Sequence, residues 1–256
     1  AIKNIYALRK RAVGLLGNIK GERRTMAFVE DCAVPPESLA DFIVEFKAVL
    51  DQQNLMYGMF GHVDAGVLHV RPALDLKTDA DREMIRLVSD QVYALCVKYK
   101  GVLWGEHGKG IRSEYCEPYF GDFYPIIRAI KTAFDPNNQL NPGKIAAPLG
   151  VDSPLYKIDS TPMRGQKDAL ISTKMWNDYR DVNFCNGNGA CFNYDLNSPM
   201  CPSYKATRDR VQSPKGRAVI LKEWERRQAT NTNSPEFEDE IFTALKTCLS
   251  CGSCTS

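Results

Sequence analysis

Residues 55–71, Leu-Met-Tyr-Gly-Met-Phe-Gly-His-Val-Asp-Ala-Gly-Val-Leu-His-Val-Arg, are predicted to form two antiparallel strands joined by a turn. If Ala65-Gly66 is a two-residue turn, His62 stands directly opposite His69. Directly opposed residues have Cβ atoms about 5 Å apart on one face of a sheet. The hairpin therefore predicts two imidazoles that are close enough to share a divalent ion.

A second glycine-rich segment, residues 105–110 (Gly-Glu-His-Gly-Lys-Gly), carries the third and last histidine of the chain. Imidazole exchanges protons near neutral pH and is the commonest metal ligand in proteins. Glu106 is a candidate third ligand for zinc, which leaves His107 available as a base. The alternative is a hydrogen-bonded pair of His62 and His69, with His107 as a plain turn residue.

The segments that flank the hairpin predict the fold class. Residues 25–31 and 101–104 have the pattern of strands, and residues 35–50, 78–99 and 120–134 have apolar side chains at helical spacing. This order of elements predicts an α+β fold in which helices pack on a largely antiparallel sheet.

The composition is that of a globular protein of one or two domains, with 256 residues and 44% hydrophobic residues. A net charge of +2 gives no electrostatic case for binding nucleic acid. No signal peptide is predicted, and without a run of about 18 apolar residues no transmembrane segment is predicted either. We expect a first domain at residues 1–147, a linker or surface arm at 148–167, and a mainly helical domain at 168–256.

The cysteines concentrate towards the end of the chain. Three of them follow the spacing Cys-x2-Cys-x2-Cys of two-cluster ferredoxins, in which a distant cysteine before a proline completes the cluster. Such a cysteine is present in Cys201-Pro202. One complete 4Fe-4S cluster is therefore predicted on four thiolates: Cys201, Cys248, Cys251 and Cys254.

A second cluster would be incomplete in this chain. It would have Cys185 and Cys191, while Asn188 occupies the position of a further cysteine. Structural zinc bound by thiolates and plain buried thiols are the alternatives for all these cysteines. Ligand-like spacing favours a reducing compartment over a disulfide framework.

Four segments resemble the C-terminal substrate domain of FAD-linked oxidases of the vanillyl-alcohol-oxidase type. They are residues 28–35 (Phe-Val-Glu-Asp-Cys-Ala-Val-Pro), the hairpin with its two histidines, residues 105–110, and residues 134–144 (Phe-Asp-Pro-Asn-Asn-Gln-Leu-Asn-Pro-Gly-Lys). The resemblance covers about residues 1–148 and is nearest to the dehydrogenases of D-2-hydroxy acids, namely D-lactate, glycolate and D-2-hydroxyglutarate. The cysteine-rich region resembles a two-cluster ferredoxin-like module, and the fusion resembles the large bacterial D-2-hydroxyglutarate dehydrogenases.

The resemblance implies a role for each part of the site. His62, His69 and Glu106 would hold a divalent metal, usually zinc, that binds the hydroxyl and carboxylate of the substrate. His107 would take the hydroxyl proton while hydride leaves for N5 of FAD. Other expected contacts are those of Asn141, Gly143 and Lys144 along the flavin and of Arg9 with a substrate carboxylate. A solvated helix face is the alternative for Arg9.

The hairpin departs from the family pattern at Asp64, Ala65 and Val67, where relatives carry Gly, Asp and Asn. Arg71 follows His69 by two residues, where relatives often carry Asn. A guanidinium can bind a carboxylate through two parallel hydrogen bonds. Arg71 therefore favours a dicarboxylate substrate such as D-2-hydroxyglutarate over lactate.

The resemblance implies an FAD- and iron–sulphur-dependent dehydrogenase of a D-2-hydroxy acid, with D-2-hydroxyglutarate as the first expectation. Electrons would pass through a cluster to a quinone or an electron-carrier protein. The alternatives are a D-lactate or glycolate dehydrogenase, and an electron-transfer or scaffold protein with a vestigial substrate domain. We expect a cytoplasmic protein, with peripheral attachment to the inner membrane and homo-oligomer formation left open.

The ends of the chain also carry an expectation. The chain begins inside a helical pattern without an initiator methionine and ends inside a cysteine motif. We therefore expect a fragment of a longer protein, which is inactive alone because its FAD-binding domain would precede residue 1.

Overall fold

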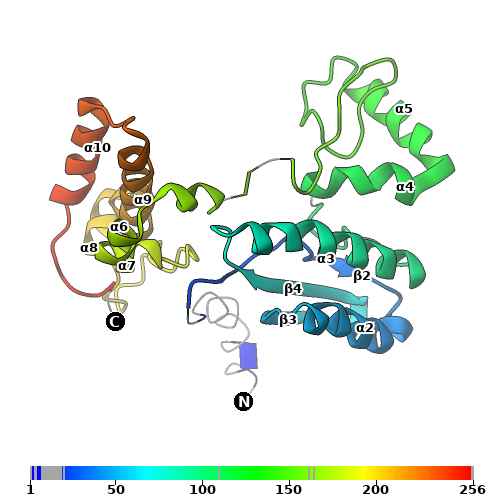
Figure 1. Cartoon of the computed structure of the whole chain (residues 1–256), viewed down its shortest axis with the longest axis horizontal. Coiled ribbons are helices and arrows are strands. Elements are labelled where there is room, and N and C mark those ends of the chain that lie inside the picture. The colour runs from blue at the N-terminus through cyan, green and yellow to red at the C-terminus, as the bar shows by residue number, and fades with distance from the viewer. Residues whose placement is uncertain are drawn as a thin grey trace. The chain divides into compact units, whose positions relative to one another are not determined.

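The computed structural model describes residues 2, 5–6, 19, 21–108, 110–160, 162–163 and 165–254. It forms two compact units, one within residues 20–164 and one that includes residues 165–256 (Figure 1). The division after residue 164 falls inside the segment for which a linker or surface arm is predicted.

An antiparallel sheet organises the first unit. Its four strands are β1 (Arg24–Thr25), β2 (Cys32–Ala33), β3 (Tyr57–His62) and β4 (Val67–Leu74). β4 is central, because β3 pairs along one edge of it while β1 and β2 pair with the two ends of the other edge. The predicted α+β class, with a largely antiparallel sheet, is confirmed.

Two of the predicted strands are shorter than expected. The strand predicted at residues 25–31 is interrupted, since Asp31 has a φ of 80°, in the left-handed region that extended chain avoids. The strand predicted at residues 101–104 is reduced to one bridge between Val102 and Ala33.

The β3–β4 hairpin has a longer loop than the predicted two-residue turn. Residues 63–65 form a 3-10 turn (η2), and Gly66 follows with a φ of 65°. The prediction that His62 stands opposite His69 is therefore wrong: His62 pairs with Val67, and Phe60 pairs with His69. A shift of two residues keeps both histidines on one face of the sheet, because side chains alternate with a period of two.

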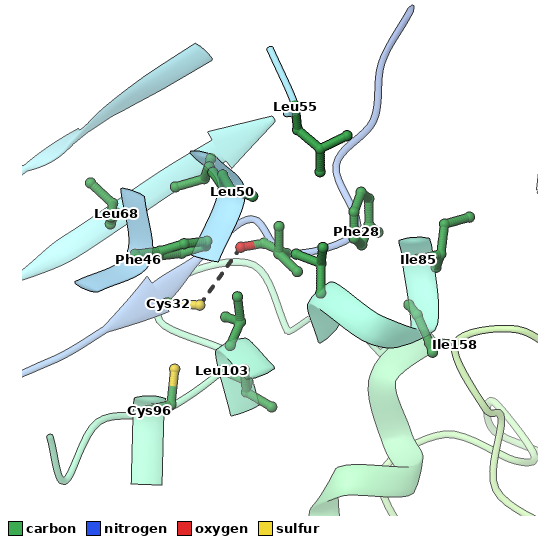
Figure 2. Packing of buried hydrophobic residues seen from close by; sticks show 14 of the residues in the cluster. Phe28, Cys32, Phe46, Leu50, Leu55, Leu68, Ile85, Cys96, Leu103 and Ile158 are labelled. Carbon is green, nitrogen blue, oxygen red and sulfur yellow. Dashed lines mark hydrogen bonds between the residues drawn. The ribbon is translucent and has the colours of Figure 1, made fainter. Parts of the chain in front are cut away.

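The core lies between the sheet and two helices, α2 (Leu39–Gln52) and α3 (Asp79–Lys98) (Figure 1). Figure 2 shows Phe46 and Leu50 of α2 near Leu68 of β4, with Ile85 and Cys96 of α3 in the same cluster. Thr78 caps α3 by accepting a hydrogen bond from the backbone N–H of Asp81 at 3.3 Å. Since Leu68, Val70 and Leu74 face these helices, the intervening residues of β4 face the other side.

The rest of the first unit is formed by short helices and an extended segment. The helices are η1 (Pro36–Ser38), η3 (Gly110–Tyr115), α4 (Cys116–Phe120), η4 (Gly121–Phe123) and α5 (Tyr124–Phe134). The extended segment, residues 135–160, contains no helix or strand. The side chain of its Ile158 is fully buried in the core of the first unit (Figure 2). The backbone N–H of Ile158 also donates to the Glu114 carboxylate at 2.6 Å. This part of the predicted linker is thus packed against the first unit.

The second unit is helical. Its helices are η5 (Gln166–Leu170), α6 (Thr173–Asp178), α7 (Arg180–Asn183), α8 (Pro202–Thr207), η6 (Arg210–Gln212), α9 (Pro214–Thr230) and α10 (Pro235–Lys246). The Ser-Pro pairs at residues 213–214 and 234–235 begin α9 and α10, where each serine hydroxyl accepts a backbone hydrogen bond. Among the described residues, none of the helices is both long enough and apolar enough to span a membrane.

Candidate functional site

The carboxylate of Glu106 lies among three imidazoles. The Nε2 atoms of His62, His69 and His107 lie 3.4, 3.2 and 3.5 Å from its oxygens. The rings of His69 and His107 are stacked, with centroids 5.2 Å apart, and the ring of His62 lies edge-on to His69 at 5.6 Å. The structure therefore brings together the four residues that the sequence singled out at two distant segments.

The sheet positions two of these imidazoles. His62 ends β3 and His69 lies in β4, on the face turned away from the core helices. The side chain of His69 is 3% exposed, whereas that of His107 is 46% exposed. The site thus has a buried side at His69 and a side open to solvent at His107.

Asp31 holds the segment that carries Glu106 and His107. The backbone N–H of Glu106 donates to both Asp31 carboxylate oxygens at 3.0 Å, and the N–H of His107 donates to one at 2.8 Å. The N–H of Gly105 donates to the backbone carbonyl of Asp31 at 2.8 Å. A Cβ on Gly105 would lie 3.0 Å from the Cβ of Ala33, so a glycine suits this close approach.

The sequence analysis missed Asp31 and its neighbour Glu30 as parts of the site. Their side chains are 0% and 4% exposed, and an acidic pair inside an apolar segment was the signal that could have revealed them. Buried carboxylates require partners, since an isolated buried charge is costly. A strand assignment over residues 25–31 concealed this, because it placed the two side chains on opposite faces.

The donor set fits a divalent cation. One ligand atom from each of Asp31, His69, Glu106 and His107 lies within 4.8 Å of the others. His62, a predicted ligand, is not one of these four residues, although its Nε2 lies 3.4 Å from a Glu106 oxygen. Imidazole nitrogen and carboxylate oxygen are ligands that zinc accepts. The buried Nδ1 of His69 makes no hydrogen bond within the described part of the chain and lies 3.7 Å from a Glu30 oxygen.

Such a site can activate an alcohol. A divalent cation polarises a bound hydroxyl, and a neighbouring neutral imidazole can remove its proton. Exposure and position favour His107 for the second task, because its ring is the most open of the three. The division into three ligands and one base stays a prediction.

Arg71 lies on the same face as His69, two residues further along β4. Its Nε and Nη2 donate to the two carboxylate oxygens of Glu30 at 2.8 and 3.0 Å, and its guanidinium lies over the Phe60 ring. The edge of the guanidinium formed by Nε and Nη2 is therefore engaged by a protein carboxylate. The predicted contact of Arg71 with substrate stays a prediction, and Arg9 lies outside the described residues.

The segment predicted to contact flavin packs against Gly110, at the end of the glycine-rich segment 105–110. Asn141 and Gly143 have φ angles of 50° and 77°, and the N–H of Lys144 donates to the carbonyl of Asn141 at 3.2 Å. The aliphatic side chain of Lys144 passes so close to Gly110 that a Cβ there would lie 2.8 Å from its Cδ. This loop is thus packed against the end of residues 105–110.

Four cysteines line a cavity of about 220 Å³ in the second unit: Cys201, Cys248, Cys251 and Cys254. Cys201 precedes α8 with a φ of 36°, and its Sγ accepts a hydrogen bond from the N–H of Tyr204 at 3.5 Å. The other three follow α10. The structure therefore gathers the four thiols predicted for one cluster, whereas Cys185 and Cys191 do not line this cavity.

A buried arginine supports the cysteine cavity. Arg217 of α9 donates through Nε to the carbonyl of Ala244 at 2.8 Å and through Nη2 to the hydroxyl of Thr247 at 3.0 Å. Its Nη1 lies 3.9 Å from the Sγ of Cys201. The N–H and hydroxyl of Ser253 lower the pKa of the Cys251 thiol, to which Arg217 adds a smaller effect in the same direction. These groups favour the thiolate form of Cys251, which is the form that can bind a metal.

Comparison with known proteins defines the class of this chain. Residues 1–145 match the family described as FAD linked oxidases, C-terminal domain. Because this match covers more than half of the 256 residues, the chain belongs to that family.

Individual relatives are more specific. The chain is 50% identical over 283 aligned residues to a protein of Pseudomonas putida named D-2-hydroxyglutarate dehydrogenase, with 99% of this chain and 28% of that protein covered. It is 46% identical over 288 aligned residues to a protein of the same name from Escherichia coli, again over 28% of the relative. A D-lactate dehydrogenase of Archaeoglobus fulgidus is 29% identical over 51% of this chain and 29% of its own length. The chain thus spans little more than a quarter of the length of these relatives.

Proposed function

We propose that this chain carries the metal- and substrate-binding part of an FAD-dependent D-2-hydroxyglutarate dehydrogenase, together with a cysteine-bound cluster. The observation that carries the proposal is the convergence of three imidazoles and Glu106, each Nε2 within 3.5 Å of that carboxylate. Identity of 46–50% over essentially the whole chain to proteins named D-2-hydroxyglutarate dehydrogenase supports the choice of substrate. The D-lactate relative matches only about half of the chain.

In the proposed reaction His62, His69 and Glu106 hold a divalent metal, most simply zinc. When bound, the metal would polarise the substrate hydroxyl and FAD would accept hydride from the substrate carbon. His107 takes the hydroxyl proton through Nε2, the nitrogen that faces the site. Arg9 and Arg71 are the proposed partners of the substrate carboxylates, and the loop with Asn141, Gly143 and Lys144 lies along the flavin.

The cysteine cavity is the proposed exit for electrons. Cys201, Cys248, Cys251 and Cys254 would bind a 4Fe-4S cluster, which requires four thiolates. The cluster would pass electrons singly from reduced flavin to a quinone or an electron-carrier protein. Support comes from the shared cavity and from the cationic Arg217 beside Cys201. Zinc bound by the same thiolates is the alternative, and the metal content distinguishes the two.

The test uses the complete protein that contains this chain, purified without oxygen. Zinc, iron and flavin are quantified first. The protein is then mixed with D-2-hydroxyglutarate, L-2-hydroxyglutarate, D-lactate or glycolate while the flavin absorbance is followed. The expected result is rapid bleaching of the flavin band by D-2-hydroxyglutarate alone, in a protein that contains both zinc and iron.

Each deviation identifies the part of the proposal that fails. Bleaching by D-lactate or glycolate would overturn the substrate assignment while leaving the site chemistry intact. A protein with flavin and iron that none of these acids bleaches would support an electron-transfer role in place of the dehydrogenase. Zinc in place of iron at the cysteines would overturn the proposed electron exit.

A further inference from the structure

Two consecutive carboxylates stand behind two of the imidazoles. An oxygen of Glu30 lies 3.7 Å from Nδ1 of His69, and an oxygen of Asp31 lies 3.6 Å from Nδ1 of His107. In both rings the other nitrogen, Nε2, faces Glu106, at 3.2 and 3.5 Å. The two histidines therefore have the same orientation: Nδ1 of each ring faces a buried carboxylate, and Nε2 faces Glu106.

The backbone at Asp31 makes this arrangement possible. Neighbouring residues of an extended strand point to opposite faces of a sheet. Asp31 instead has a φ of 80°, and regular pairing begins only at Cys32. This conformation is unfavourable for a residue with a side chain, although Asp tolerates it better than most. Local strain of this kind is often kept at functional sites, and here both acidic side chains reach one site.

We propose that Glu30 and Asp31 are positioning residues that fix His69 and His107 with Nε2 directed into the site. This inference rests on the proposed function and adds two residues to it. The two contacts are longer than hydrogen bonds, but a negative carboxylate beside Nδ1 favours the tautomer with the proton on Nδ1, which leaves the lone pair of Nε2 for a metal or for the substrate proton. Asp31 has the additional task of holding the backbone of Glu106 and His107.

The two residues are expected to act on different steps. Glu30 supports His69, a proposed metal ligand that is almost fully buried. Asp31 supports His107, the proposed base, and a misdirected base slows proton removal without releasing the metal. Loss of such supporting carboxylates typically lowers metal affinity or activity about 10- to 100-fold.

The experiment compares Glu30→Gln and Asp31→Asn in the complete flavin-containing protein. Both changes keep the side-chain size and an acceptor oxygen while removing the negative charge. The readouts are the zinc dissociation constant, measured by competition with a chelator, the visible spectrum of the cobalt-substituted protein, and kcat and KM for D-2-hydroxyglutarate. Glu30→Gln should weaken zinc binding about 10- to 100-fold and alter the cobalt spectrum. Asp31→Asn should lower kcat by a similar factor and should weaken zinc binding less than Glu30→Gln does, because Asp31 contacts the proposed ligand Glu106 only through its backbone N–H.

Asp81→Asn is the matched control. Asp81 is also a buried carboxylate of the first unit, where it accepts a backbone hydrogen bond from Asp75 and pairs with Arg23. This variant should lose thermal stability but keep the zinc affinity and kcat of the parent protein. The inference is overturned if Glu30→Gln and Asp31→Asn behave like Asp81→Asn. A parent protein that binds no zinc and does not turn over would instead refute the proposed function itself.

Discussion

The histidine site and the cysteine cavity differ in how firmly the surrounding protein holds their ligand residues. At the histidine site the supporting residues Glu30, Asp31 and His69 are all less than 5% exposed. At the cysteine cavity Cys201 is buried, whereas Cys248, Cys251 and Cys254 are exposed. The first site is held by the sheet and by buried carboxylates, and the second has one firmly placed thiol and three on a loop.

This difference indicates how each site would depend on its metal. Ligands fixed by surrounding hydrogen bonds, such as those of Asp31 with residues 105–107, are expected to keep their geometry without the ion. Ligands on an exposed loop gain order from the ion itself, so that binding and local folding are coupled. The contrast predicts that the two sites respond differently to loss of a ligand and to loss of metal.

The largest effect is expected from Cys201→Ser, which removes the buried anchor of the cysteine cavity. A cubane cluster with three thiolates is incomplete, so the iron bound at this cavity and the electron transfer to an external acceptor should be lost. The flavin should still be bleached by D-2-hydroxyglutarate at the parental rate, because the histidine site lies in the other unit. Iron analysis and stopped-flow absorbance measure the two effects separately.

Cys116→Ser is the control for this change. Cys116 is also fully buried, but it belongs to the first unit and lines no part of the cysteine cavity. It should keep its iron and its acceptor activity. Equal iron loss in both variants would mean that the cavity does not bind the cluster.

The next largest effect tests the histidine site. His107→Ala should slow flavin reduction by D-2-hydroxyglutarate about 10²- to 10⁴-fold, the usual contribution of a positioned base. The zinc content should stay unchanged, because the other imidazoles and Glu106 remain. His62→Ala should reduce both zinc content and activity. A His107→Ala protein that bleaches at the parental rate would remove this residue from the role of base.

The sequence could predict those parts of the molecule that depend on local patterns. Side-chain chemistry and spacing were sufficient to predict that the three imidazoles lie near Glu106 and that the four cavity cysteines lie together, because each belongs to a local pattern. The starts of two helices were predictable for the same reason, because the pairs Ser213-Pro214 and Ser234-Pro235 are local signals. The hairpin register could not be predicted, since it depends on Gly66 packing against the carbonyl of Val34, a residue of a different segment.

The partners of Asp31 could not be predicted for a related reason. Its role depends on a left-handed backbone that pattern analysis treats as extended strand, and on partners more than 70 residues away in the chain. Such long-range hydrogen bonds leave no periodic trace in the sequence. The signal that was present, two adjacent acidic residues in an apolar segment, indicates burial with a partner but does not identify the partner.

A smaller effect concerns the reactivity of the thiols in protein stripped of metal. Hydrogen bonds from Ser253 hold the pKa of Cys251 below its usual value of 9.0, whereas burial raises the pKa of Cys116 to about 12. Thiolate is the reactive form, so at pH 8 iodoacetamide should label Cys251 at least several hundred-fold faster than Cys116. The rate at Cys251 should rise with pH and level off at a lower pH than the rate at an ordinary thiol. Mass spectrometry measures both sites, and protection of Cys251 when iron is restored would place the thiol at the metal.

The smallest effect is expected from a substitution at Gly66, in the turn between His62 and His69. Gly66→Ala introduces a Cβ at a φ of 65° and within 1.9 Å of the Val34 carbonyl oxygen, so the loop must move. Gly150→Ala is its control, because Gly150 has a φ of 76° but no atom within 4 Å of the added Cβ. Both variants carry the backbone cost of about 1 kcal/mol for a left-handed residue, and Gly66→Ala should lose a further 1–2 kcal/mol or so in the free energy of unfolding. It should also weaken zinc binding, since the turn holds the end of β3 at His62, whereas Gly150→Ala should not. Equal loss of stability in the two variants would show that the close approach to Val34 is not what fixes this hairpin.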